Sequence, residues 1–350
     1  MKHIVFDCER MKYSNTGLYH YCLNLGLHIA RQQDPAREQM AFFIPPNAVP
    51  AFQGPVLYQH PLRKFLMPAL RSFDIWHGTY QNSDYLPFRN RRIKVVLSIH
   101  DLNFLYEPKS KAKKERYLRH LQANIDRSDA IVCVSRFCYD DVQRHCDTGN
   151  KQVYTIHNGT NHLEQPSLFP YSYKPARPFL FSLGTLCAKK NFHVLLPLLR
   201  QQEQMELLIA GPRQDSDYES LIHRIASDLG VSHRLRMLGN ISENEKSWYY
   251  HNCYAFVLPS LAEGFGLTVM EAMSVGKPVF LSGRTALPEI GRDAAFYFHD
   301  FSEDHMNSVF SDGMARYRLQ EMRDQIQKRS ESFCWKKAAT AYLEVYRTLY

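Results

Sequence analysis

The sequence predicts an α/β protein built from two domains, each with a parallel sheet. Short apolar runs typical of buried parallel strands alternate with helical segments along most of the chain. At 350 residues, the chain is longer than a single domain usually is. Three prolines and few periodic apolar residues mark 161–177 as a linker. We expect a first domain over residues 1–165, a second over 166–332, and a separate last helix over 333–350.

The first half begins with a charged residue and a short apolar strand. It has no long apolar segment and no cleavage site, so it does not resemble a signal peptide. The expected elements are strand 2–6, helix 16–30, strands 40–44 and 55–59, helix 62–73, strand 94–99, helix 117–127, strand 130–134, a helix after Ser135, and strand 151–156.

The second half shows a similar alternation of strands and helices. The expected strands are 179–183, 206–210, 234–238, 254–258 and 279–281, and the expected helices are 191–200, 218–229, 242–252, 267–275 and 304–328. The last helix, 333–350, has one apolar side that includes Trp335, Tyr342 and Tyr346.

The bulk composition limits the function classes. No run of about eighteen apolar residues occurs, so no membrane span is expected. The eight cysteines form no C-x-x-C pair and the sixteen histidines are dispersed, which predicts reduced thiols, no zinc site and a cytoplasmic protein. The net charge of +8 fits phosphorylated substrates or an anionic membrane surface. Since no nucleic-acid motif accompanies this charge, we do not expect nucleic-acid binding.

The most informative stretch is 254–282, which reads as strand, glycine loop, helix and strand. Gly264 and Gly266 allow a sharp turn and the close approach of a ligand. Gly276 suits a left-handed helix end, and Pro278 prevents the helix from continuing. Because free N–H groups and the helix dipole attract anions, this loop is a candidate phosphate site.

Two glutamates, Glu263 and Glu271, flank this loop with seven residues between them. A carboxylate repels phosphate because both are negative, but it can accept hydrogen bonds from the ribose and hexose hydroxyls of a sugar nucleotide. The alternative is an ordinary βαβ unit with surface glutamates. With Gly-Phe-Gly between the glutamates and Gly-Lys-Pro-Val after them, the stretch resembles the signature of the retaining GT-B glycosyltransferases of family 4.

A pair of lysines, Lys189 and Lys190, follows the strand at 179–183. Such a pair before a helix is usually solvated, yet cations are disfavoured at helix N-termini, and this conflict indicates function. The stretch 184–191 resembles the phosphate motif of the same family, in which Lys190 matches the phosphate-binding lysine. Lys189 stands where many members have arginine, and Thr185 replaces an arginine of some branches.

Gly17 and His100 are candidates in the first half. Gly17 lies in a strand-to-helix loop and is alternatively a plain turn residue. His100 ends the strand at 94–99, where open α/β sheets bind ligands, and is alternatively a structural histidine. The family has a glycine loop and a sugar-contacting histidine at these places, and residues 99–104 resemble the mannosyltransferase-like members. Residues 74–78 resemble a short strand of the family.

A basic run and an Asp-Ser-Asp triplet can each be interpreted in more than one way. The lysine-rich run 109–116, with Arg63 and Lys64, is either a solvated helix face or a contact with an anionic membrane surface or an acceptor diphosphate. Asp215-Ser216-Asp217 has the D-x-D pattern of a metal site, but N-capping of the following helix explains it better. We therefore expect no metal requirement.

The resemblance implies a GT-B fold, in which two Rossmann-like domains face each other across a cleft and the last helix returns to the N-terminal domain. It implies that Lys189, Lys190 and the N–H groups of the glycine loop hold the donor diphosphate, and that Glu271 accepts hydrogen bonds from the ribose. It also implies that Glu263 and His100 contact the transferred sugar. The implied site residues are, as catalytic, Glu263, His100 and Lys190, and as donor-binding, Lys189, Lys190, Phe265, Gly266, Leu267, Glu271 and Gly17.

The expected activity is retaining transfer of a hexose from a nucleotide-diphosphate sugar to a glycan or lipid-linked acceptor in bacterial cell-surface polysaccharide or lipopolysaccharide synthesis. The likeness around His100 and Lys190 favours GDP-mannose, with a UDP-hexose as the other donor and no cofactor or metal. The chain would be cytoplasmic, with peripheral contact at the inner membrane face. The alternatives are a non-catalytic sugar-nucleotide-binding subunit acting through a partner, and a GT-B epimerase or phosphorylase.

Overall fold

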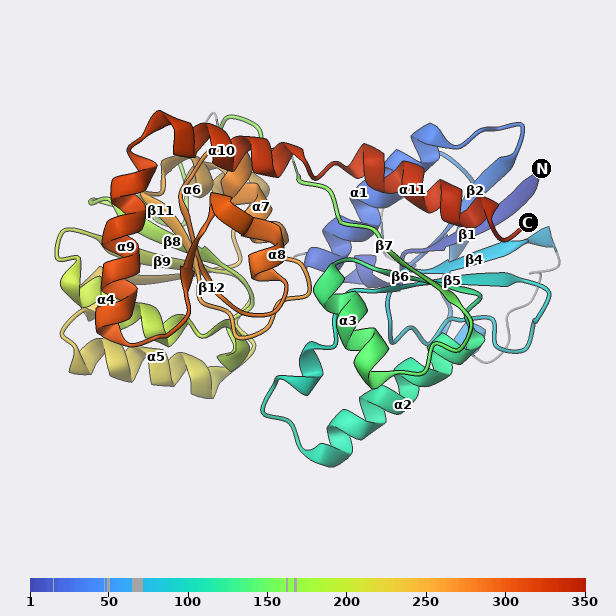
Figure 1. The fold of residues 1–350 in the computed structure, drawn as a ribbon, viewed down its shortest axis with the longest axis horizontal. Coiled ribbons are helices and arrows are strands. Elements are labelled where there is room, and N and C mark those ends of the chain that lie inside the picture. The colour runs from blue at the N-terminus through green and yellow to red at the C-terminus, as the bar shows by residue number, and fades with distance from the viewer. Residues whose placement is uncertain (15, 47, 49–50, 65–71, 162, 167–168) are drawn as a thin grey trace. The chain divides into compact units, whose positions relative to one another are not determined.

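The computed structural model describes residues 1–14, 16–46, 48, 51–64, 72–161, 163–166 and 169–350. The chain forms two compact units (Figure 1). Unit 1 comprises Met1–Gly159 and Phe333–Tyr350, and unit 2 comprises Thr160–Ser332. Unit 2 begins earlier than the expected residue 166 because Thr160 and Asn161 already bond within it, to the Ser330 carbonyl at 3.1 Å and the Glu271 carboxylate at 2.9 Å.

The described part of unit 1 contains a seven-stranded sheet in which every pair is parallel. Its order is β3-β2-β1-β4-β5-β6-β7. The bounds are β1 Lys2–Asp7, β2 Glu38–Ile44, β3 Val56–Tyr58, β4 Ile75–Gly78, β5 Lys94–Ile99, β6 Ala130–Cys133 and β7 Gln152–Thr155. Because all strands are parallel, their carboxyl ends lie at one edge, where residues after β1, β4 and β5 meet.

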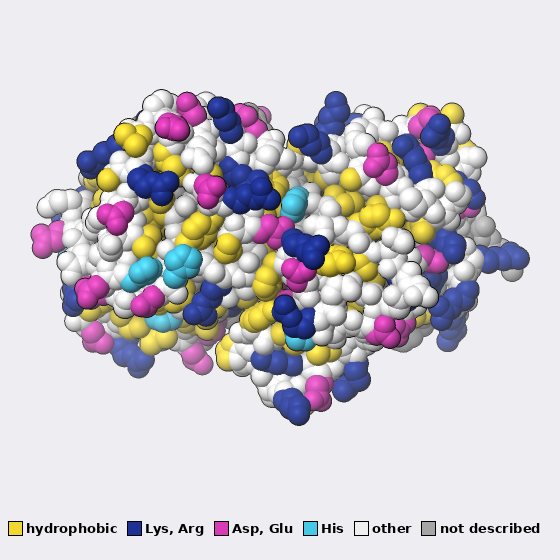
Figure 2. Space-filling view, viewed as in Figure 1, with side chains coloured by type: hydrophobic (Ala, Val, Ile, Leu, Met, Phe, Trp, Pro, Cys, Tyr) yellow, Lys and Arg dark blue, Asp and Glu magenta, His cyan; other side chains and the backbone are white. Residues whose placement is uncertain are grey.

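The helices of unit 1 are α1 Gly17–Gln32, α2 Lys111–Arg127, α3 Arg136–His145 and α11 Trp335–Arg347, with short 3₁₀ turns η1 Glu9–Lys12, η2 Pro61–Lys64 and η4 Asn103–Leu105. The start expected for α2, residue 117, is wrong. Ser110 caps the helix by accepting from the Lys113 N–H, so the basic run lies in its first turns. Figure 2 shows Lys and Arg side chains over α2. Of the helix expected at 62–73, residues 65–71 lie outside the described residues.

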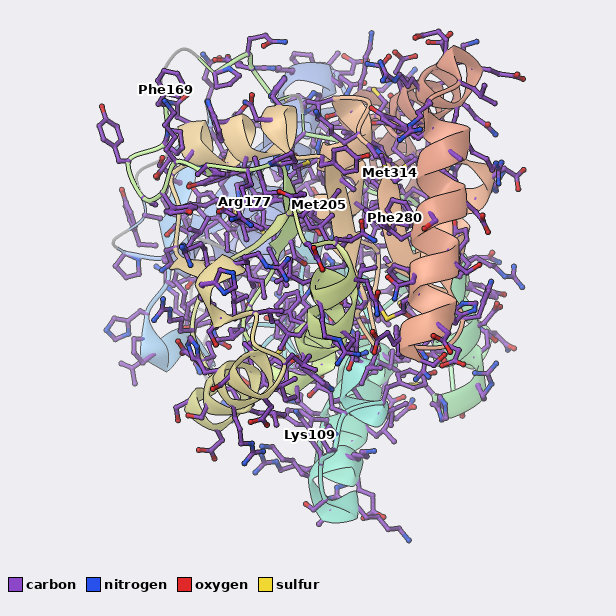
Figure 3. The ribbon with its side chains drawn as sticks, turned by 90° about the vertical axis from the view of Figure 1, so that its left-hand side faces the viewer. Lys109, Phe169, Arg177, Met205, Phe280 and Met314 are labelled. Carbon is purple, nitrogen blue, oxygen red and sulfur yellow. The ribbon has the colours of Figure 1, made fainter. Side chains whose placement is uncertain are left out.

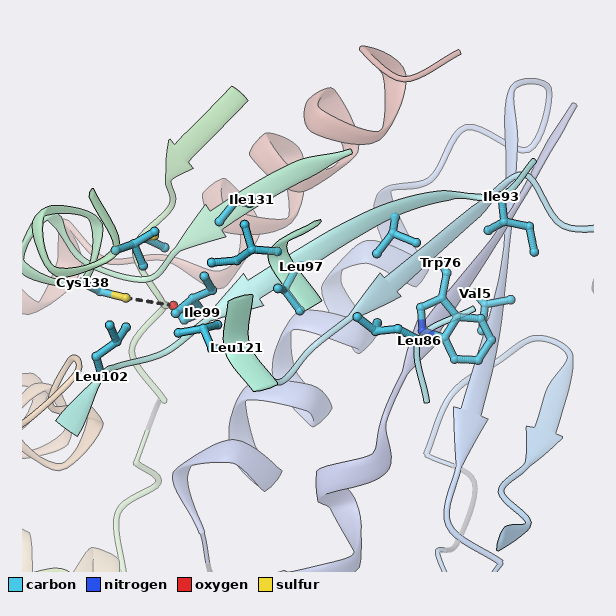
Figure 4. Packing of buried hydrophobic residues seen from close by; sticks show 14 of the residues in the cluster. Val5, Trp76, Leu86, Ile93, Leu97, Ile99, Leu102, Leu121, Ile131 and Cys138 are labelled. Atoms are coloured by element: carbon cyan, nitrogen blue, oxygen red, sulfur yellow. Dashed lines mark hydrogen bonds between the residues drawn. The ribbon is translucent and has the colours of Figure 1, made fainter. Parts of the chain in front are cut away.

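The core of unit 1 packs helices against the sheet (Figure 4). The buried side chains of Val5, Trp76 and Leu97 come from neighbouring strands, and Leu121 of α2 lies beside Leu97 and Ile99 of β5 (Figure 4). Cys138 of α3 donates its Sγ–H to the Ile99 carbonyl at 3.3 Å. The apolar runs of the sequence therefore lie where a doubly covered parallel sheet requires them.

The last helix, α11, returns to unit 1 and packs along α1 (Figure 1). The Tyr342 hydroxyl lies 2.8 Å from both the Tyr21 hydroxyl and Ser98 Oγ. The Tyr346 hydroxyl lies 2.7 Å from His77 Nδ1. All five side chains are fully or almost fully buried, so the C-terminus is fixed to the sheet by a closed polar network.

The described part of unit 2 holds a six-stranded sheet, also parallel throughout, of order β10-β9-β8-β11-β12-β13. The bounds are β8 Phe179–Leu183, β9 Glu206–Ala210, β10 Leu235–Gly239, β11 Ala255–Leu258, β12 Val279–Ser282 and β13 Phe296–Phe298. Phe280 of β12, labelled in Figure 3, packs in the core against Phe310 of the covering helix α9, with 4.8 Å between the ring centroids. Two Rossmann-like α/β units are thus present.

The helices of unit 2 are α4 Leu195–Gln201, α5 Ser216–Asp228, α6 Glu243–Asn252, α7 Leu267–Ser274, α8 Leu287–Gly291, α9 Glu303–Tyr317 and α10 Gln320–Glu331, with 3₁₀ turns η5 Ala188–Lys190, η6 Phe192–Val194, η7 Ser232–Arg234 and η8 Arg292–Ala294. The single helix expected at 304–328 is wrong, because Leu319 is extended and separates α9 from α10. The helix expected at 191–200 begins later, because Asn191 has a left-handed φ of 58° and the 3₁₀ turn η6 precedes α4, which starts at Leu195.

Two further findings concern membranes and metals. Within the described ranges, no helix is long and apolar enough to cross a membrane. The same residues hold no cluster of three His, Cys, Asp or Glu side chains arranged to bind a metal ion. Asp215 caps α5 by accepting from the Tyr218 N–H at 3.0 Å, so the N-cap interpretation of the D-x-D triplet is confirmed for Asp215.

Candidate active site

The glycine loop between β11 and α7 has the geometry that its sequence predicts. Gly266 is the residue before α7 and has a φ of +109°, a conformation that L side chains rarely adopt. A Cβ there would also lie only 3.2 Å from Leu287. The first N–H groups of a helix have no partner within that helix. The N–H groups of Gly266 and Leu267 therefore lie where the positive end of the α7 dipole lies.

Lys190 and Glu263 form an ion pair beside this loop. Lys190 Nζ lies 2.6 Å from Glu263 Oε1, and each side chain is only 13% exposed. The Glu263 N–H donates to Thr285 Oγ1 at 2.9 Å, which fixes the backbone of the carboxylate. Burial raises the pKa of Glu263, but the charges of Lys190 and Lys189 and the hydrogen bond from Lys190 outweigh burial and lower it overall. Glu263 is therefore a stable carboxylate at neutral pH.

Gly184 explains how Lys190 reaches this position. A Cβ at Gly184 would lie 2.8 Å from Lys190 Cε, so a larger residue would displace the lysine side chain. Lys189 contributes its charge to the Glu263 environment, and its carbonyl accepts from the Leu261 N–H at 2.8 Å. The two lysines lie in η5, before α4 begins. The expected conflict between these cations and a helix N-terminus is therefore absent, although their place beside Glu263 agrees with an anion site.

Glu271 forms a second, more deeply buried ion pair. Its Oε1 accepts from Lys246 Nζ at 3.2 Å and from Asn161 Nδ2 at 2.9 Å, and its Oε2 accepts from the Tyr250 hydroxyl at 3.1 Å. The side chains of Lys246 and Glu271 are 7% and 5% exposed. Burial lowers the pKa of Lys246, but the charges of Glu271 and Glu243 outweigh burial and raise it. A carboxylate has about four lone-pair positions, so Glu271 retains capacity for one further donor.

Sequence reasoning missed the partners of Glu271. Lys246 lies one turn after Ser242, which caps α6 through a capping box with Glu245. A lysine on an expected helix normally faces solvent. The available signal was the paired glutamate at Glu243, which contacts Lys246 at 2.7 Å, but it carries no information about Glu271.

A small hollow lies next to Gly184. It lies at the carboxyl ends of β8, β9 and β10 and is open to solvent. Its lining consists of Gly184, Leu186, Ile209, Gly211, Arg213, Met237 and Gly239. Arg213, another residue that sequence reasoning missed, donates to the Met237 carbonyl at 2.7 Å and pairs with Glu219 at 3.1 Å. The glycines that end β9 and β10 were the only sequence signal for this hollow.

His100 lies at the carboxyl end of β5 in unit 1. Its Nε2 lies 2.8 Å from the Thr79 carbonyl, and because a carbonyl only accepts, Nε2 carries the proton. The ring packs edge-on against Tyr21 with 4.4 Å between centroids. Burial lowers the pKa of His100 to about 4, so the ring is neutral at pH 7 and Nδ1 is an acceptor.

Gly17 is the first residue of α1 and is exposed. Thr16 caps this helix by accepting from the Tyr19 N–H at 3.3 Å. The structure thus brings Lys189, Lys190 and Glu263 together in unit 2, with Phe265, Gly266, Leu267 and Glu271 on the adjoining loop and helix. Gly17 and His100 belong to unit 1.

Comparisons with known proteins identify the family and the fold of this chain. The model of the family described as "Glycosyl transferases group 1" matches residues 169–331, and that of "Glycosyltransferase Family 4" matches residues 27–162. The O-antigen chain mannosyltransferase B of Escherichia coli is 27% identical over 99% of this chain and 100% of its own length. The serotype-specific mannosyltransferase WbdA of Escherichia coli is 29% identical over 74% of this chain, but the match spans only 34% of WbdA.

Several solved structures share the fold of nearly the whole chain. HepE of Anabaena, solved in complex with UDP-glucose, superposes with a TM-score of 0.74 at 16% identity, and the match covers 99% of this chain and 100% of HepE. The two family models together cover most of both units. The chain therefore belongs to glycosyltransferase family 4, the glycosyl transferases group 1, and has the GT-B fold.

Proposed function

We propose that this glycosyltransferase moves a hexose, with mannose favoured, from a nucleotide-diphosphate sugar to a glycan or lipid-linked acceptor in bacterial cell-surface polysaccharide or lipopolysaccharide synthesis. We further propose that the transferred sugar retains its anomeric configuration. The observation that carries the proposal is the Lys190–Glu263 ion pair beside the N-terminus of α7. Similarity to O-antigen mannosyltransferases supports the acceptor class and the sugar.

In this proposal, the donor diphosphate binds at Lys190, Lys189 and the N–H groups of Phe265, Gly266 and Leu267. Its negative charge increases as it leaves, so cations and N–H donors that are already in place stabilise the transition state. Lys190 changes partner from Glu263 to phosphate, and both oxygens of Glu263 then become available to sugar hydroxyls. The pair holds both side chains in place before the donor arrives.

The remaining residues have positional roles. Glu271 can accept a hydrogen bond from one ribose hydroxyl, while Lys246, Asn161 and Tyr250 hold its carboxylate in place. The His100 ring is neutral, and its Nδ1 accepts a hydrogen bond from a hydroxyl of the transferred sugar. Gly17 leaves the start of α1 open to the sugar or its acceptor.

Lys189 and Lys190 supply the positive charge that a divalent cation supplies in other transferases, so we propose that the reaction is metal-independent. Activity that disappears with EDTA and returns with Mn²⁺ or Mg²⁺ would contradict this.

Peripheral contact with an anionic membrane surface is part of the proposal. Lys111, Lys113 and Arg116 are exposed on the first turns of α2, whereas Lys64 pairs with Asp84 at 2.6 Å. Cosedimentation with vesicles should therefore require anionic lipid and weaken with salt. Binding that is equal for neutral and anionic vesicles would contradict this contact.

The test of the reaction uses transfer to water, which needs no known acceptor. The protein is incubated with GDP-mannose and with UDP-hexoses, and NMR records the anomer of the first free sugar released. We expect the α-anomer from an α-linked donor and no release by Glu263→Gln. Release of the β-anomer would contradict retention, and equal release by Glu263→Gln would contradict the site assignment.

A further inference from the structure

The carboxyl edge of the unit 1 sheet carries an arginine that the proposed reaction does not use. Arg10 lies in η1, directly after β1. Its guanidinium carbon lies 4.4 Å from the centre of the Tyr80 ring and 4.8 Å from the centre of the Tyr13 ring. Two aromatic rings thus hold the flat guanidinium, which limits its rotation before any ligand binds.

Among the residues that the structure describes, the Arg10 guanidinium forms no ion pair with a carboxylate. Within the described ranges, its Nε is buried without a hydrogen-bond partner, and the nearby Glu9 carboxylate interacts with it through charge, since the Arg10 charge lowers the pKa of Glu9. The neighbouring acid, Glu9, is turned inward, where its carboxylate accepts from Ser83 Oγ at 2.5 Å. An arginine that is held in place but left unpaired is suited to an anion from outside.

A second cation increases the positive charge of this surface. Lys12 Nζ lies 4.8 Å from the Tyr13 ring centre, so Arg10 and Lys12 flank the same ring. Tyr13 is 45% exposed, which places the group at the molecular surface. Two cations gathered around one exposed ring repel each other, and a bound anion relieves that repulsion.

Arg10 and Tyr80 lie near His100, the histidine that we assign to the transferred sugar. Tyr80 follows β4 and His100 follows β5, and these strands are neighbours in the sheet. The charge of Arg10 is close enough to contribute to the lowered pKa of His100, after burial. The group therefore lies on the same sheet edge as the histidine assigned to the transferred sugar.

We propose that Arg10, with Lys12, forms an anion subsite for the acceptor and binds a phosphate or carboxylate group carried by the acceptor glycan. This inference rests on the proposed transfer reaction and names the class of its acceptor. The guanidinium fork binds two oxygens of the anion, and Lys12 adds a point charge.

Direct binding tests the subsite without any transfer. The probes are mannose 6-phosphate, glucuronate and the uncharged methyl α-mannoside, titrated by isothermal calorimetry. We expect at least one charged probe to bind more tightly than methyl α-mannoside, and comparing the two separates phosphate from carboxylate. Arg10→Gln should weaken that binding about tenfold, and Lys12→Gln about threefold. Arg323→Gln removes a cation over Tyr317 in unit 2 and is the matched control, with no expected change.

The donor site is the competing location for an anion. Lys190→Gln should leave binding of the charged probes unchanged, because their site is in unit 1. Loss of binding in Lys190→Gln together with unchanged binding in Arg10→Gln would overturn the proposal, as would equal binding of charged and uncharged probes. If Arg10→Gln does not fold, the binding measured with Lys12→Gln tests the subsite, because the Lys12 side chain is exposed. Charged probes that bind as expected while no sugar nucleotide does would contradict the transfer reaction instead.

Discussion

Replacing Lys190 with methionine perturbs the ion pair at the centre of the candidate site. The Nζ–Oε1 distance of 2.6 Å corresponds to an attraction of about 6 kcal/mol at an effective dielectric constant of about 20. Desolvation offsets part of this attraction, and removing one partner of a buried pair costs about 3–5 kcal/mol. Because each side chain is still 13% exposed, we expect Lys190→Met to lower the free energy of unfolding by about 2–3 kcal/mol.

The assay is urea-induced unfolding followed by tryptophan fluorescence. Trp248 is the one of the three tryptophans that lies in unit 2, so its transition reports the unit that holds the pair. Lys174→Met is the control, since Lys174 is exposed in the same unit, and it should change stability by less than about 0.5 kcal/mol. In a double-mutant cycle with Glu263→Gln, we expect a coupling above about 1 kcal/mol. Additive effects of the two substitutions would refute the ion pair.

Three other perturbations have defined outcomes. Lys246→Met should destabilise unit 2 by about 3 kcal/mol in the same assay because it leaves Glu271 buried without its cation, and an unchanged unfolding midpoint would contradict this. Tyr342→Phe should cost about 1–3 kcal/mol and lower kcat more than it changes KM, because the hydroxyl holds Tyr21 against His100; an unchanged kcat would exclude that positioning role. The lowered pKa of Glu263 means that its contribution to stability is present above the unfolded value of about 4.3 and is lost as pH falls through the folded value. The stability difference between wild type and Glu263→Gln should therefore shrink on acidification, and a difference that grows would contradict the sign.

The sequence predicted the elements whose signals are local. Gly266 and Gly276 both have positive φ, as expected at the start and just after the end of α7. Gly184 and Lys190 lie in one loop, so a motif of fixed spacing was enough to place them beside each other. The apolar runs of the inner strands, such as β5 and β11, are buried because a parallel sheet covered on both faces requires it, whereas the edge strands β3 and β7 are partly exposed.

The rest depended on interactions between distant segments. Lys246 and Glu271 lie 25 residues apart, and nothing in either segment indicates that they meet in a buried pair. The early start of α2 depends on Ser110, a weak cap followed by charged residues. The break at Leu319 has neither glycine nor proline beside it, and so it had no local signal. The cluster of Arg10 with Tyr13 and Tyr80 joins two loops that only the strand order brings together.

The central claim is that Lys190 and Glu263 bind a nucleotide-diphosphate sugar. A thermal-shift panel of GDP-, UDP-, ADP- and dTDP-sugars, without added metal, tests it most directly. A ligand that binds the native state raises its apparent stability with the logarithm of ligand concentration over Kd. We expect one nucleotide to raise the Tm of the wild type selectively, and this rise to be absent in Lys190→Met and retained in Lys174→Met. No shift with any donor, or an equal shift in Lys190→Met, would contradict the claim.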